Sequence, residues 1–93
     1  MTPSKPGQAE WNRVYAAKQK GLEAMNEAES TKATDFDRKR KAYDRAIAAF
    51  HESLDALKTW RTCEGVDPAT ADQQDQEIRM FLKGCQKSRP MGN

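Results

Sequence analysis

The chain has 93 residues, of which 37% are hydrophobic and 32% are charged, and its formal net charge is +2. This length fits one small domain, and no apolar run is long enough for a transmembrane helix. The opening segment, MTPSKPGQAE, lacks the apolar stretch of a signal peptide. We therefore expect a cytoplasmic protein.

Residues 1–7 contain two of the four prolines and show no hydrophobic periodicity, so we expect a flexible leader. A first helix is predicted over about residues 8–30. Its large apolar side chains share one face, at Trp11, Val14, Tyr15, Leu22 and Met25. A seam of small residues runs beside them, at Ala17, Gly21, Ala24 and Ala28. Small side chains let helix backbones approach closely, so we expect this helix to pack along the next one.

The second helix is predicted over about residues 35–62, with Thr34 as its N-cap and Asp37 completing an acidic capping box. It carries a large apolar seam at Phe36, Tyr43, Ile47, Phe50, Leu54 and Leu57. A small seam lies alongside, at Ala42, Ala46, Ala49, Ser53, Ala56 and Trp60. Together the seams cover about half of the circumference, more than the stripe of roughly 100° on an ordinary surface helix. This helix should therefore lie between two others.

Strong start signals follow Gly65, where Asp67 is a good N-cap and Pro68 a good first helical residue. The third helix is predicted over about residues 68–88, with a flexible tail at 90–93. Its apolar arc is narrower, with Ala71, Ile78, Phe81, Leu82 and Cys85. The predicted fold is all-α, an antiparallel up-down-up three-helix bundle over residues 8–89.

No catalytic motif is present: the sequence has no HExxH, no phosphate loop and no nucleophile with a base at helical spacing. We expect no enzymatic activity, no cofactor and no small-molecule substrate. Cys63 and Cys85 are expected to be reduced and buried, and with the lone His51 they are too few for a metal site. His51 is interpreted as a residue at the margin of the apolar face.

Four consecutive basic residues, 38–41, begin the second helix. They could bind an anionic membrane or a nucleic acid. In a helix, however, four consecutive side chains point in all directions, and Asp35, Asp37 and Asp44 lie close by. We therefore favour a solvated first turn. On that basis we expect no nucleic-acid partner and only peripheral membrane contact, with an anionic-surface binder as one alternative.

The small seam of the second helix also has two interpretations. Alanine is the best helix former, and the seam can serve close packing alone. Alternatively, the narrow third helix leaves part of the seam uncovered, as a shallow groove that admits a partner helix.

Within the second helix, Tyr43-x-x-Ala46-Ile47-x-x-Phe50 resembles the Y-x-x-A-[VI]-x-x-F run of the microtubule-interacting and trafficking (MIT) domain. Phe81-Leu82 stands where that family often has Tyr-Leu. The resemblance covers about residues 9–88 and implies a three-helix bundle that captures short C-terminal helical motifs of ESCRT-III subunits. It further implies binding between the second and third helices or between the first and third, and recruitment to endosomal membranes.

The resemblance and the small seam together place a peptide groove between the second and third helices. Its expected walls are Ala49, Ser53, Ala56 and Trp60 on one side, and Ile78, Leu82 and Cys85 on the other. Asp72, Asp75 and Glu77 form an expected charged rim that pairs with basic ligand residues, which would set orientation and on-rate. The alternative function is a structural bundle that self-associates or docks within a larger protein through the same surface.

Overall fold

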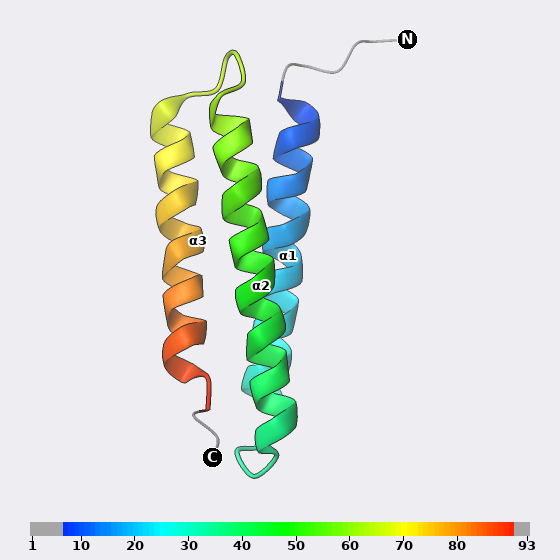
Figure 1. The fold of residues 1–93 in the computed structure, drawn as a ribbon. Helices are drawn as coiled ribbons and strands as arrows, with labels where there is room; N and C mark the ends of the chain where they lie inside the picture. Colours follow the sequence, from blue (N-terminus) through cyan, green and yellow to red (C-terminus); the bar gives the residue numbers. More distant parts are fainter. Residues whose placement is uncertain (1–6, 91–93) are drawn as a thin grey trace.

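The computed structural model describes residues 7–90 and contains three α-helices, α1 (Gln8–Ser30), α2 (Phe36–Arg61) and α3 (Pro68–Ser88). Successive helices run in opposite directions and lie side by side (Figure 1). The predicted all-α, up-down-up three-helix bundle is therefore confirmed. The predicted leader and tail lie outside the described residues, except for Gly7 and Pro90. Within residues 7–90, no helix is long and apolar enough to cross a membrane.

The helix ends follow local capping chemistry, with one correction. Asp67 accepts a hydrogen bond from the Ala69 backbone N–H, at 3.2 Å, and Pro68 opens α3 as predicted. The predicted capping box at Thr34 and Asp37 is wrong, because Asp35 holds the N-cap position of α2 and makes no side-chain capping bond. On the other side of this hairpin, the Thr31 hydroxyl donates to the Glu27 carbonyl in the last turn of α1, at 2.7 Å.

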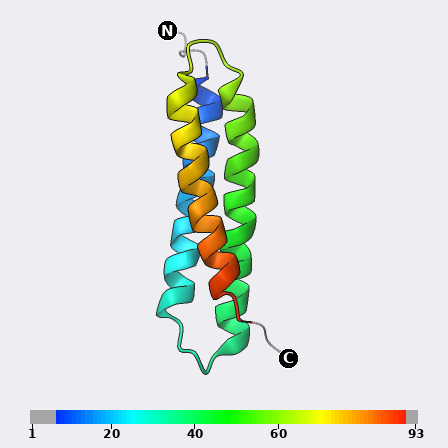
Figure 2. The same cartoon turned by 90° about the vertical axis from the view of Figure 1, so that its left-hand side faces the viewer.

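The core runs along α2, which contributes buried side chains from both of its seams, and α2 lies between its two neighbours as predicted. Figure 2 shows α3 lying across the front of the α1–α2 pair. The largest fully buried side chains come from all three helices, at Phe50, Leu57, Ile78, Val14 and Cys85. Burial of this apolar surface is the main source of stability.

Two aromatic residues that the periodicity assigns to the apolar faces are exposed, Phe36 at 59% and Tyr15 at 55%. Phe36 lies in the first turn of α2, beyond the point where α3 ends (Figure 2). It therefore has no third helix to cover it. Tyr15 stands about 100° around α1 from the buried Val14, at the margin of the packed face.

The small residues of α1 and α2 bring these helices close together. Gly21 leaves room for the ring of Phe50: a Cβ built at Gly21 would lie 2.6 Å from Phe50 Cε1. Nearby, the buried Ser53 hydroxyl donates to the Val14 carbonyl of α1 at 3.0 Å. The interpretation of the small seam as a close-packing surface is therefore correct for its buried part.

Candidate protein-interaction surface

The α2 wall of the predicted groove faces α1 rather than α3. Ser53 is fully buried and bonded to α1, and Trp60 packs on Trp11 of α1 with ring centroids 4.8 Å apart. Ala49 and Ala56 line hollows formed by α1 and α2. The reason is steric, because only the small seam lets the α1 backbone approach this closely, while the large seam fills the core.

The α3 wall of the predicted groove is part of the core. Ile78, Leu82 and Cys85 are 0%, 7% and 0% exposed. The expectation that Leu82 lines an open groove and touches a ligand is wrong, because its side chain is buried in the core. The two predicted walls therefore do not face each other across an open groove.

The three predicted rim carboxylates pair within the chain. Asp72 accepts from Arg61 of α2, Asp75 from Arg79 one turn later in α3, and Glu77 from Lys18 of α1, each at 2.8 Å. Sequence alone does not reveal these partners, because two of the three lie on other helices. The pairs occupy the carboxylates that were expected to meet a ligand.

A different groove lies between α1 and α2. It consists of two adjoining hollows of about 500 Å³ and 430 Å³, which share Lys20 and Glu52 and so form one continuous depression. We call it the α1–α2 groove; its lining comprises Glu10, Arg13, Ala16, Ala17, Lys20, Glu23, Ala24 and Glu27 of α1, with Arg45, Ala48, Ala49, Glu52, Asp55, Ala56 and Thr59 of α2. From Arg45 to Thr59 the groove is about 21 Å long, at 1.5 Å of rise per residue.

Small side chains form the floor of the α1–α2 groove. Ala24 of α1 and Ala48 of α2 lie in one hollow, and Ala16 and Ala56 lie in the other. None of its lining residues comes from α3, which covers the opposite side of the α1–α2 pair (Figure 2). Ala16 and Ala48 are exposed among charged residues, a sequence pattern that a groove shares with an ordinary solvated helix face.

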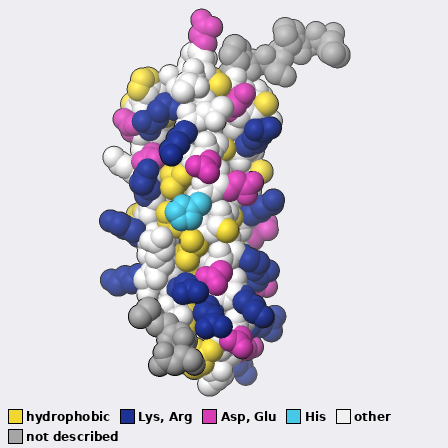
Figure 3. Space-filling model, in the orientation of Figure 1, with side chains coloured by type: hydrophobic (Ala, Val, Ile, Leu, Met, Phe, Trp, Pro, Cys, Tyr) yellow, Lys and Arg dark blue, Asp and Glu magenta, His cyan; other side chains and the backbone are white. Residues whose placement is uncertain are grey.

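Charged side chains border the floor on both sides, and basic and acidic groups alternate over the α1 side of Figure 3. At one end, Arg45 pairs with Glu27 across the groove. At its middle, Lys20 and Glu52 line both hollows, and neither forms an ion pair with another residue of the described 7–90 range. The groove thus combines a floor of small side chains with two charged groups at its middle, Lys20 and Glu52, that are free to meet a ligand.

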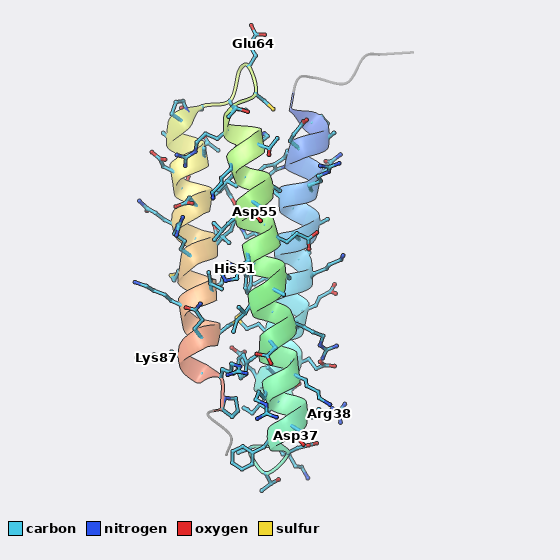
Figure 4. The ribbon with its side chains drawn as sticks, viewed as in Figure 1. Asp37, Arg38, His51, Asp55, Glu64 and Lys87 are labelled. Carbon is cyan, nitrogen blue, oxygen red and sulfur yellow. The ribbon has the colours of Figure 1, made fainter. Side chains whose placement is uncertain are left out.

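The remaining candidate residues do not gather into a second site. His51 is exposed and projects from α2 toward α3 (Figure 4), with hydrophobic atoms above and below it in Figure 3. Arg38 and Lys87 project on opposite sides of the bundle (Figure 4). Arg40 pairs with Asp37, so the basic start of α2 is partly neutralised by its own first turn.

Both cysteines are free; Cys85 is buried and Cys63 is half-buried, which corrects the expectation of two buried thiols. Burial, followed by the nearby Glu29 carboxylate, raises the pKa of Cys85. Desolvation, followed by Glu10, raises the pKa of Cys63. Neither thiol has the lowered pKa of a reactive cysteine. Among residues 7–90, no three His, Cys, Asp or Glu side chains are placed to hold a metal ion.

The chain matches no protein-family model, no curated protein and no solved structure.

Proposed function

We propose that this bundle is a non-catalytic interaction module that binds one further helix in the α1–α2 groove. The observation that carries the proposal is the continuous, alanine-floored depression about 21 Å long, which matches about 14 residues of helix. Small floor residues let a helix backbone come close, and the charged borders can fix its direction. Binding of an amphipathic helix in a groove between helices is a common mode of recognition.

The α2–α3 side supports such binding less well. Ion pairs join the two helices near both ends, Arg61 with Asp72 and Arg89 with Asp44. A smaller hollow of about 290 Å³ lies beside the first of these pairs and is lined largely by charged residues. A ligand helix there would have to separate these charges before it reached the apolar core.

The resemblance to the MIT domain supplies the partner class that we propose to test first, the helical C-terminal motifs of ESCRT-III-type subunits. Such binding would recruit the protein to endosomal membranes. The groove proposed here differs from the two grooves that the resemblance implies. The proposal for the partner class and the proposal for the groove can therefore fail separately.

The test is a binding titration of fluorescently labelled ESCRT-III C-terminal peptides, followed by anisotropy. Ala48→Gln would place a longer side chain on the groove floor and should weaken binding at least about tenfold, or about 1.4 kcal/mol. The matched control is Ala69→Gln, at an exposed alanine of α3 outside the groove, which should bind like the parent. Equal affinities for Ala48→Gln and the parent would contradict the proposed groove, and no binding by any peptide would contradict the partner class.

A further inference from the structure

We propose that the α1–α2 groove packs face to face against the same groove of a second copy of this chain, around a two-fold axis parallel to the bundle. This inference rests on the proposed function of the groove and names its partner. It depends on which residues lie at the same level along α1 and α2.

The lining of the groove defines these levels. Lys20 and Glu52 lie together at the middle, where both hollows meet. Glu27 and Arg45, which form an ion pair, mark one end. Between these charged levels the two helices bring alanines together, Ala24 with Ala48 and Ala16 with Ala56. Levels occupied by charged residues therefore alternate along the groove with levels occupied by alanines.

A two-fold axis parallel to the helices would place α1 of one copy on α2 of the other at the same level. Lys20 would then face Glu52 of the second copy, and the Glu27–Arg45 ion pair of one copy would face the same pair of the other with opposite charges opposed. Alanine levels would meet alanine levels, which allows close approach. Each α1 would also run antiparallel to the α2 that it covers, so all four contacting helices would have antiparallel neighbours, as in up-down-up-down bundles.

The other symmetric arrangement has its axis perpendicular to the helices and is disfavoured by charge. With this axis at the middle of the groove, where the contact covers its whole length, α1 would lie on α1 and α2 on α2, so that Lys20 faces Lys20 and Glu52 faces Glu52. Like charges that face each other across an interface destabilise the complex that brings them together. Among arrangements that cover the whole groove, the order of charges thus favours the parallel two-fold dimer.

The size of the contact predicts a weak dimer. The contact face is as long as the groove, about 21 Å, and two helix diameters wide, about 20 Å. Its area is therefore about 400 Å² on each copy. Stable complexes bury about 800 Å² per partner. We therefore expect association that depends on protein concentration and weakens at high ionic strength, because its charged contacts are only partly shielded from solvent.

The test uses two charge reversals, Lys20→Glu and Glu52→Lys, in sedimentation velocity under reducing conditions at low salt. Concentrations should run from about 20 µM to about 1 mM, so that mass action reveals a weak dimer. The parent should form dimers at the upper end. Each variant alone brings like charges together at both symmetric contacts, and its dissociation constant should rise at least about tenfold.

The decisive sample is the equimolar mixture of the two variants. At one contact the glutamate introduced by Lys20→Glu would face the lysine introduced by Glu52→Lys, and at the other the native Lys20 and Glu52 would face each other. The mixed dimer should therefore form although neither variant dimerises alone. Each variant alone carries like charges at positions 20 and 52. A change in the fold of a single chain therefore cannot explain dimers that form only in the mixture. Circular dichroism should show that both variants keep the helical content of the parent.

A parent that stays monomeric at about 1 mM and low salt, or a mixture that stays monomeric, would overturn the second copy as the partner. If helical peptides still bind in the groove, the proposed function survives that result. If peptides also leave the groove unoccupied, both proposals fail. A second copy and a peptide in the same groove exclude each other, so added peptide should dissociate the dimer.

Discussion

Gly21 of α1 lies directly against the ring of Phe50 of α2, and a Cβ at this glycine would lie 2.6–2.8 Å from three atoms of the ring. Phe50 is fully buried and cannot move away freely. Gly21→Ala should therefore destabilise the fold, because overpacking costs roughly 1–3 kcal/mol and exceeds the gain of up to about 1 kcal/mol in helix propensity. Chemical denaturation would measure the change.

Gly84 provides the matched control, since it also lies within a helix but a Cβ added there would meet no neighbouring atom within 4 Å. Gly84→Ala should stabilise the fold by roughly 0.5–1 kcal/mol, through helix propensity alone. A Gly21→Ala variant as stable as Gly84→Ala would show that α1 and α2 are not in close contact at Phe50.

Ile78 and Met80 of α3 form a second matched pair, one fully buried and the other 63% exposed. Ile78→Ala removes buried methyl groups and should lower the free energy of unfolding by roughly 2–5 kcal/mol. Met80→Ala should change it by less than about 0.5 kcal/mol. Similar losses for the two variants in a thermal melt would mean that the face of α3 turned toward the core is assigned incorrectly.

The Lys18–Glu77 ion pair links α1 directly to α3. Lys18 is largely buried, with 14% of its side chain exposed, and its ammonium also donates to Gln74 at 3.3 Å. A double-mutant cycle with Lys18→Met and Glu77→Gln should give a coupling energy of about 1 kcal/mol, since partial burial limits screening. The exposed Arg79–Asp75 pair should give about 0.3 kcal/mol in the same cycle format. Equal coupling would argue that Lys18 is solvated.

The two thiols should differ in their reaction with iodoacetamide. Cys63 is half-buried near the end of the bundle and should react first, whereas Cys85 is fully buried and should react only when the bundle opens. The raised pKa of Cys63 means that its labelling rate increases only above the pH at which a free thiol ionises, whereas Cys85, labelled only in the opened state, should follow the pH dependence of a free thiol. Ile78→Ala should accelerate labelling of Cys85 while leaving Cys63 unchanged. Mass spectrometry of the labelled chain would separate the two rates.

Periodicity predicts the helices and most of the core because burial of one helix face is a local property of the sequence. It places Phe50, Leu54 and Ile78 correctly for this reason. Which neighbour a face contacts is not local. The sequence assigns Ser53 and Trp60 to a groove with α3, whereas both contact α1.

The candidate site is predicted less well, because its chemistry depends on pairs from different helices. Glu77 forms an ion pair with Lys18, 59 positions earlier in the chain, and no local sequence pattern predicts this pair. The α1–α2 groove depends on Ala16 and Ala48, which lie among charged residues, a pattern typical of solvated helix faces. They become one floor only because, along the two antiparallel helices, Ala16 lies level with Ala56 and Ala48 lies level with Ala24.

The central claim is that the α1–α2 groove receives a helix, and amide chemical-shift mapping of the ¹⁵N-labelled chain tests it most directly. Spectra should be compared across protein concentration and with the ESCRT-III peptides. The account predicts shifts that cluster on the groove, around Ala16, Ala24, Ala48 and Ala56, while exposed residues of α3 such as Met80 stay unchanged. Shifts confined to α3, or no shift at the groove under any of these conditions, would contradict it.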